Sequence, residues 1–242
     1  MPENTNQPVR PELFTTVIAR GGSATRAIAD SLKRSGINMG KTNVFGDKPP
    51  YQIIYDLARL MCTDYMRVRG EEFDFTAALE NPVPDVARHG IETYLSDIAL
   101  VSGPRGWKLP ETVLIFPWLV RLYPDLWYIY WTRGVWDLRN HKSDMLLVEW
   151  GVLPETRDLM RLAALSWKLQ YDIVAQTPRP ARWLHVRMED YVLDHNRTRA
   201  RLEQFLGMSL DMTPPRPETV KKSTPLDYEF TLAPMRELGY DV

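Results

Sequence analysis

The sequence predicts an α/β fold in which helices flank a parallel β-sheet. The segments 13–19, 126–132 and 183–188 have the apolar, β-branched and aromatic content of buried strands. Segments with helical spacing separate them, and strands that alternate with helices usually form parallel sheets. At 242 residues the chain is long enough to bury a full core, so we expect a single domain.

The first strand, 13–19, leads through a glycine pair into a helix. Ser23 is a favoured N-cap residue, and apolar residues then recur at helical spacing until Gly36, a favoured glycine just past a helix end. Further helices are expected at 51–68 and near 85–96. These later helices are expected to serve as scaffold.

Pro110 opens a helical segment, 110–124, with start signals at its first two residues, and Pro117 inside it predicts a kink. The strand 126–132 follows. An amphipathic helix is expected at 154–177, then the strand 183–188 and a helix from Glu189 to Leu206. We expect residues 1–11 to be a disordered lead to a domain over 12–242, and 211–226 to be a surface loop.

Composition limits the classes of partner. The net charge is −1, which gives no overall attraction to nucleic acid or to an anionic membrane, so we expect neither. The single cysteine, Cys62, excludes an intramolecular disulfide and any multi-cysteine metal site. No segment has the length of a membrane span or the pattern of a signal peptide, so a cytoplasmic protein is predicted.

The turn ARGGSATR, 19–26, has the context of a phosphate-binding loop. Glycines let the backbone approach an anion, and a following helix N-terminus offers unpaired N–H groups. Ser23 and Thr25 supply hydroxyls, and Arg20 and Arg26 supply charge. A plain structural turn is the alternative. The later segment GINMGKT, 36–42, resembles a Walker A ending, but its glycines are one residue too close and it follows a helix.

A second candidate anion site follows the strand 126–132. Arg133 lies where a parallel strand delivers side chains to the carboxyl edge of the sheet. The alternative is a surface ion pair between Arg133 and Asp137. Two anion sites at two strand ends indicate a ligand with two phosphate-like groups.

Five segments in order resemble the sulfotransferases that use 3′-phosphoadenosine 5′-phosphosulfate (PAPS). ARGGSATR resembles their 5′-phosphosulfate loop, and the stretch from Gly106 to Gly134 resembles the approach to their 3′-phosphate arginine. INMGKTN, VRMEDYVLDHNRTRARLEQFLGMSL and RELGYDV resemble three further segments of the family. The resemblance implies a P-loop-like fold, PAPS as co-substrate without a metal, and sulfuryl transfer to a hydroxyl or amine of a small-molecule or glycan acceptor.

The sequence departs from the family pattern in four places. Gly22 replaces the basic residue before the loop serine, and Ala24 replaces the glycine after it. His141 occupies the place of the second 3′-phosphate residue, with Ser143 two residues on as the alternative. Met188 stands where relatives often have a tyrosine near the adenine.

The resemblance implies these site residues. The donor is expected to bind Arg20, Gly21, Gly22, Ser23, Ala24, Thr25, Arg26, Arg133, His141 and Ser143. The expected catalytic residues are Arg20, Lys108, Glu111 and His141.

Sulfuryl transfer needs cations at the leaving oxygen and a base for the acceptor. Arg20 is expected to replace the missing basic residue, with Lys108 as the second candidate. Glu111 is preferred as base over His141 and His89, and one helical turn would present Lys108 and Glu111 together. His185 is expected to be a hydrogen-bonded residue of the core or one that supports the site residues from behind, and Arg187, Glu189 and Asp190 are expected to tie its strand to the sheet. A P-loop-like kinase and an inactive nucleotide-binding relative are the other hypotheses.

Overall fold

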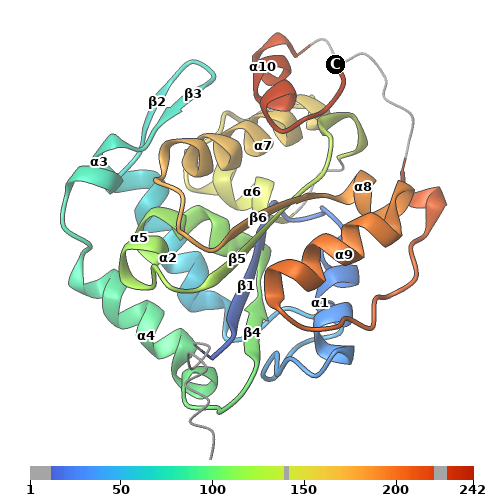
Figure 1. Cartoon of the computed structure of the whole chain (residues 1–242). Coiled ribbons are helices and arrows are strands. Elements are labelled where there is room, and N and C mark those ends of the chain that lie inside the picture. Colours follow the sequence, from blue (N-terminus) through green and yellow to red (C-terminus); the bar gives the residue numbers. More distant parts are fainter. Residues whose placement is uncertain (1–11, 139–141, 221–227) are drawn as a thin grey trace, which may run out of the picture.

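The computed structural model describes residues 12–138, 142–220 and 228–242. Its core is a parallel sheet in the order β4-β1-β5-β6, with helices on both faces (Figure 1). The strands are β1 (Phe14–Ala19), β4 (Arg105–Lys108), β5 (Trp127–Thr132) and β6 (Trp183–Arg187). The α/β class, the parallel sheet and the single domain predicted from the sequence are confirmed.

The register of the sheet brings the strand ends together. Val17 of β1 pairs with Lys108 of β4 and with Ile129 of β5, and Thr132 of β5 pairs with Arg187 of β6. Because all four strands run in parallel, their carboxyl ends share one edge. The chain passes from β1 to β4 on one side and then to β5 on the other, so the strand order reverses beside β1, where α/β proteins bind ligands.

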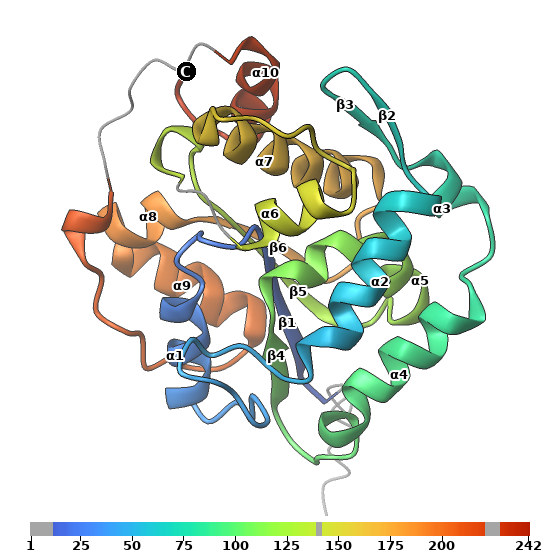
Figure 2. The ribbon, with the colours of Figure 1, turned by 180° about the vertical axis from the view of Figure 1, so that it is seen from behind.

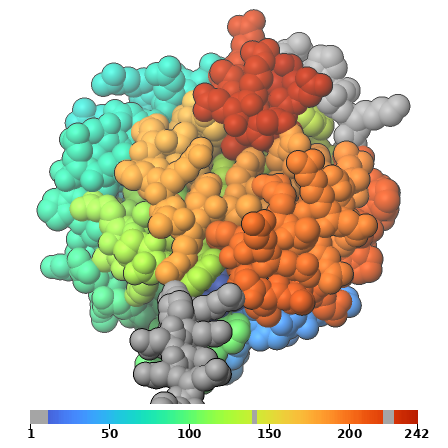
Figure 3. All heavy atoms as spheres, viewed as in Figure 1, coloured from blue at the N-terminus to red at the C-terminus, as the bar shows by residue number. Residues whose placement is uncertain are grey.

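Two apolar clusters cover the two faces of the sheet. One contains residues of α2 (Tyr51–Asp64), α4 (Asp85–Ala99), α5 (Phe116–Leu122) and α7 (Leu159–Gln176). The other contains residues of α1 (Arg26–Arg34), α8 (Met188–Leu193) and α9 (His195–Leu206). These three helices lie together on one side of the sheet in the opposite view as well (Figure 2). On the face seen in Figure 3, the later part of the chain, coloured orange and red, covers the centre, right and top, and earlier residues, coloured teal and green, cover the left.

Several predicted helix bounds are wrong. The first helix begins at Arg26 and not near Ser23, whereas Gly36 has the positive φ, 88°, expected past its end. The segment 110–124 is a 3₁₀ helix, Pro110–Ile115, followed by α5, so the break precedes Pro117. Asp158 caps α7 by accepting from the amides of Met160 and Arg161, so this helix starts later than 154.

The predicted last helix is two helices, α8 and α9, and Gly207 ends the second with a φ of 69°. Six of the described α-helices and β-strands were not predicted: β4, β2 (Arg67–Arg69), β3 (Glu72–Asp74), α3 (Thr76–Glu80), α6 (Lys142–Glu149) and α10 (Glu229–Glu237). A short 3₁₀ helix, Pro217–Thr219, lies in the expected surface loop. The expected disordered lead, residues 1–11, lies outside the described residues.

Cys62 of α2 is buried in the core, and burial raises the pKa of its thiol to about 12. Among the helices that the structure describes, none combines the length and apolar character that crossing a membrane requires.

Candidate active site

The loop between β1 and α1 has an unusual backbone. Gly22 has a φ of 82°, and Ala24 has a φ of 60°. Both values lie in the left-handed region, which residues other than glycine rarely adopt. The indole of Trp131, on β5, donates to the carbonyl of Ser23 at 2.8 Å. This contact fixes the loop against the neighbouring strand, with both Ser23 and Thr25 buried.

The loop presents unpaired backbone donors. Within the described part of the chain, the amides of Gly22, Ala24, Thr25 and Arg26 donate to no protein acceptor. Thr25 is the N-cap residue of α1, and its side chain makes no capping hydrogen bond. Free N–H groups at a helix N-terminus form a binding site for phosphate or sulfate.

Arg133 follows β5 and lies beside this loop. Its guanidinium donates to Asp137 at 2.5 and 2.9 Å, to the carbonyl of Thr219 at 2.7 Å and to the carbonyl of Gly22 at 3.3 Å. The ion pair with Asp137 does form, but the Asp137 side chain is buried, so it is not the surface pair considered as the alternative. Arg133 therefore joins the two strand ends that flank the reversal in strand order.

A cavity of about 390 Å³ lies at this point of the sheet. Trp131, Met188 and Tyr191 give it an apolar side, and Arg133 and Arg216 give it positive charge. Its size and mixture of flat apolar and cationic groups suit a nucleotide with an anionic substituent. We call it the nucleotide cavity.

Arg20 lines neither the nucleotide cavity nor the second cavity, which lies on the other side of the loop. Its guanidinium donates to Asp144 of α6 at 2.5 Å and to the carbonyl of Gly21 at 2.9 Å, and both charged side chains are buried. Burial lowers the pKa of Arg20, and Asp144 opposes that effect. In this position Arg20 links the loop, through the carbonyl of Gly21, to Asp144 of α6.

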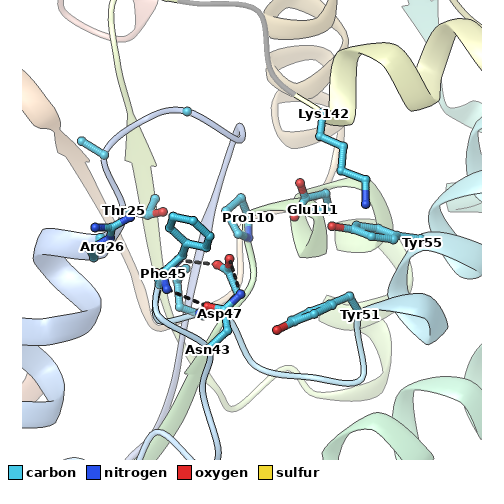
Figure 4. Close-up of a pocket in the computed structure, with 13 residues that line it drawn as sticks. Thr25, Arg26, Asn43, Phe45, Asp47, Tyr51, Tyr55, Pro110, Glu111 and Lys142 are labelled. Atoms are coloured by element: carbon cyan, nitrogen blue, oxygen red, sulfur yellow. Dashed lines mark hydrogen bonds and ion pairs between the residues drawn. The ribbon is translucent and has the colours of Figure 1, made fainter.

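A second cavity, of about 470 Å³, opens on the other side of the loop (Figure 4). Gly22, Ala24 and Arg26 line both cavities, so the loop separates them. We call the second one the acceptor-side cavity. Its remaining lining residues are Thr25, Asn43, Phe45, Asp47, Tyr51, Tyr55, Lys108, Pro110, Glu111 and Lys142.

Lys108 is one of the cations that line this cavity. Its ammonium group forms an ion pair with Asp47 and donates to the carbonyl of Phe45 at 2.8 Å. Asn43 closes the same short loop, because its side-chain oxygen accepts from the amides of Phe45 and Asp47 at 2.8 and 2.9 Å. The segment 43–47 is thereby fastened onto the end of β4.

Glu111 lies in the first turn after β4, and its carboxyl group is buried. Burial raises the pKa of Glu111 to about 7, with a further contribution from Asp47, while Lys108 and Lys142 lower it. Lys108 and Glu111 do not share one helical turn, since Lys108 ends a strand and Glu111 starts a 3₁₀ helix. Both nevertheless line the acceptor-side cavity.

Two other predicted residues lie elsewhere. Ser143 is buried in α6 and lines neither cavity, and His89 is on the exposed side of α4. His141 falls outside the described residues.

The cavity-lining residues that were not predicted from the sequence include Asp47, Tyr51, Tyr55, Trp131 and Lys142. Only Lys142 carried a signal, because it belongs to the charged stretch after β5.

The strand end at β6 is held by a chain of polar contacts. Thr132 lies 2.8 Å from the Nε2 of His185 and 3.0 Å from the hydroxyl of Tyr240. Tyr240 also donates to Glu189, which accepts from the amide of Gly134 at 2.8 Å. Arg187 pairs with Asp190 at 2.6 Å. These are the contacts of a structural tie.

A parallel sheet with an amide-lined loop between β1 and α1 defines a P-loop-like α/β architecture. Among solved structures, the chain is similar to the sulfotransferase domain from the curacin biosynthetic pathway, with a TM-score of 0.55, 15% identity, and 96% of this chain and 99% of that chain covered. It is also similar to the sulfotransferase domain of the Synechococcus olefin synthase, with a TM-score of 0.54, 14% identity and coverage of 97% and 98%.

A sulfotransferase from Alicyclobacillus acidocaldarius matches with a TM-score of 0.50, 14% identity and coverage of 97% and 98%. No protein-family model and no curated protein matches the sequence. At these identities the likeness concerns the fold, and the chain has the fold of the bacterial sulfotransferases.

Proposed function

We propose that the protein is a sulfotransferase that moves a sulfuryl group from PAPS to a hydroxyl or amine of an acceptor. The observation that carries the proposal is the position of Arg133 beside the amide-lined loop, at the reversal in strand order. Two anion-binding elements at two strand ends suit a donor with a 3′-phosphate and a 5′-phosphosulfate. The shared fold supports the same assignment.

The residues present fit this donor. The amides of Gly22, Ala24, Thr25 and Arg26 would hold the 5′-phosphosulfate, and Arg133 the 3′-phosphate. Trp131 and Tyr191, which are 0% and 2% exposed, would form the apolar floor beneath the adenine. Gly21 and Ser23 would shape the loop, and His141 and Ser143 stay candidates for a second contact with the 3′-phosphate.

In the proposed reaction the acceptor oxygen or nitrogen bonds to sulfur as the bond from sulfur to the 5′-phosphate oxygen breaks. Adenosine 3′,5′-bisphosphate leaves with the electron pair of that bond, and Glu111 takes the acceptor proton. A carboxyl group with a pKa of about 7 is well matched to this task near neutral pH. Lys108, His141 and Arg26 are the candidates to stabilise charge around the transfer.

Arg20 is proposed as a positioning residue for the loop. It holds the carbonyl of Gly21 and the carboxylate of Asp144, so it acts on the transferred group through the backbone. Its direct action on the leaving oxygen stays a prediction from the sequence.

The donor assignment is tested by ligand binding. We expect adenosine 3′,5′-bisphosphate to raise the melting temperature more than ATP does and without a divalent metal, because a ligand that binds the folded state stabilises it. Stronger stabilisation by ATP with Mg²⁺ would favour the kinase hypothesis instead.

Arg133→Ala should weaken binding of the bisphosphate by about 1.5–3 kcal/mol, the range for a lost hydrogen bond to a charged group. Isothermal titration calorimetry measures this effect, with Arg197→Ala on the exposed side of α9 as the matched control. An unchanged affinity in Arg133→Ala would remove the 3′-phosphate assignment.

A further inference from the structure

The acceptor-side cavity has two walls of different chemistry (Figure 4). Thr25 and Arg26 of the phosphate loop lie on one side, and Tyr51, Tyr55 and Lys142 lie on the other. The second wall is formed by α2 and the start of α6. None of its three residues lines the nucleotide cavity. An acceptor would rest on this wall.

We infer that the acceptor is a small aromatic hydroxyl compound that carries an anionic group. This inference rests on the proposed function, because it takes the amide-lined loop as the donor side. It names the class of substrate for the same site.

The aromatic part follows from the side chains that line the cavity. Tyr51 and Tyr55 come from the first two turns of α2, and Phe45 reaches the cavity from the loop fastened to Lys108. Phe45 is 52% exposed, so about half of its apolar side chain is available for contact with a ligand. Flat aromatic surfaces of this kind favour a ring as ligand, through stacked or edge-to-face contacts.

The anionic part follows from Lys142. Its ammonium group lies 5.5 Å from the centroid of the Tyr55 ring, and the side chain points from α6 into the cavity. Among the described residues, no carboxylate forms an ion pair with Lys142.

The other two cations of the cavity differ from Lys142. Lys108 is paired with Asp47, and Arg26 lies over the Phe45 ring and faces both cavities. Lys142 is therefore the cation on the acceptor wall whose charge a ligand can complement.

The hydroxyl part follows from Glu111. Its carboxyl group lies between Pro110 and Tyr55 in Figure 4, at the floor shared by the two walls. A ring against Tyr51 and Tyr55 would place its hydroxyl between Glu111 and the loop and its anionic substituent near Lys142. A volume of about 470 Å³ has room for one substituted ring beside the sulfuryl group.

The test compares ligands that differ in charge and little in shape. Binding of 3- and 4-hydroxybenzoate, the matching hydroxybenzamides and the matching hydroxybenzylamines is measured by calorimetry, with and without saturating adenosine 3′,5′-bisphosphate. We expect at least one hydroxybenzoate to bind about ten-fold more tightly than its amide, the scale of one partly desolvated charge contact.

Variants of Lys142 assign the preference to its charge. Lys142→Gln should abolish the preference for the carboxylate while the affinity for the amide changes less than about two-fold, and Lys142→Glu should favour the amine. Lys41→Gln, an exposed lysine that does not line the cavity, is the matched control and should retain the preference.

Equal affinities for carboxylate and amide in the unaltered protein would overturn the inference, as would a preference that survives Lys142→Glu or a failure of every ring compound to bind. Bisphosphate affinity is measured separately on the same samples. If the bisphosphate binds and the ring compounds do not discriminate, the acceptor inference alone fails; if the bisphosphate does not bind, the donor assignment fails.

Discussion

The carboxyl group of Glu111 has a pKa close to neutral pH, so small changes in pH alter its charge. Its carboxyl group is buried, which raises its pKa to about 7, and a backbone hydrogen bond together with the cations Lys108 and Lys142 keeps the pKa from rising further. A base must be ionised to accept a proton. The rate of transfer should therefore increase with pH through about 7 and level off above it.

Glu111→Gln is expected to lower the turnover rate by about 10²–10⁴-fold and to remove this rise with pH, because the amide cannot accept the proton. Binding of adenosine 3′,5′-bisphosphate should stay within about two-fold, since Glu111 does not line the nucleotide cavity. Single-turnover kinetics across pH 5–9 measure the first effect and calorimetry the second. Glu92→Gln, on the exposed side of α4, is the control, and a full rate in Glu111→Gln would exclude Glu111 as the base.

Ala24 has a left-handed backbone with a φ of 60°, a conformation that costs a residue other than glycine about 1–3 kcal/mol. Ala24→Gly is expected to raise the free energy of unfolding by up to about 1 kcal/mol, because the relief of strain exceeds the added chain entropy. Ala24→Val should lower it by about 1–3 kcal/mol. Urea denaturation measures both.

The same substitution in the adjacent helix provides the control. Ala27→Gly lies inside α1, where glycine lowers stability by about 0.5–1 kcal/mol. Opposite signs for Ala24→Gly and Ala27→Gly are the expected result. A loss of stability in both would mean that Ala24 is not strained.

At the scale of elements, the sequence predicted the three strands of the parallel sheet that have continuous apolar runs and missed the fourth, β4, which has none. β1, β5 and β6 are recognisable from their composition, whereas β4 is Arg105-Gly106-Trp107-Lys108, with charged ends and a central glycine. Its pairing with β1 is what makes it a strand. Such pairing joins residues about 90 positions apart, which local patterns cannot reveal.

The positions of the candidate site residues were predictable to a similar degree. The loop after β1 and the position of Arg133 follow from strand ends, so composition was enough. The partners of the charged groups were not predictable: Arg20 pairs with Asp144 and Lys108 with Asp47, over separations of 124 and 61 residues. These contacts depend on how α6 and the segment 43–47 pack on the sheet.

Gly106 has a steric role in the contact between β4 and β1. A Cβ atom there would lie 2.5 Å from the carbonyl oxygen of Thr15 and 2.7 Å from its Cγ2, so β4 would have to move. Gly106→Ala is expected to lower the free energy of unfolding by about 1–3 kcal/mol, the usual cost of overpacking. Because β4 carries Lys108, the turnover rate should also fall.

Gly90→Ala is the matched control. A Cβ atom at Gly90 meets the side-chain tip of Leu57, with a nearest distance of 3.1 Å, and alanine favours the helix. Urea denaturation should show a much smaller loss for this variant. Equal losses in the two variants would show that β4 can shift without strain.

At the scale of the whole molecule, two buried groups give the stability opposite dependences on pH. Burial lowers the pKa of His185 to about 4, with contributions from Arg187 and Arg201, and raises that of Glu111 to about 7. Below pH 6.5 the unfolded chain binds a proton at His185 that the folded protein does not bind, so stability falls toward pH 4. Above pH 4.5 the unfolded chain releases a proton that folded Glu111 keeps, so stability falls toward pH 7.

We therefore expect these two contributions to oppose each other between pH 4.5 and 6.5. His185→Gln should lose the His185 contribution, so that relative to the unaltered protein it gains about 3 kcal/mol as the pH is lowered from 6.5 to 4. Glu111→Gln should gain a similar amount as the pH is raised from 4.5 to 7. Urea denaturation at each pH measures the differences, and His195→Gln, a histidine at the start of α9, is the control.

A variant curve parallel to that of the unaltered protein would contradict the assigned direction for its group. The comparison uses differences between variants, so contributions from the remaining carboxylates cancel. The glutamine amide in His185→Gln can still form a hydrogen bond with Thr132, as His185 does. The variant therefore removes the titrating group while keeping a polar contact at this position.

The burial of Cys62 has a practical consequence for spectroscopy. Its thiol lies in the core and has a pKa of about 12, so it is protonated and shielded from maleimide reagents in the folded protein. A single cysteine introduced at Val44, which is 83% exposed on the loop held by Lys108, would then accept a fluorescent label at one position without removal of the native thiol. Emission from that label would report when a ring compound enters beside Phe45, independently of any turnover.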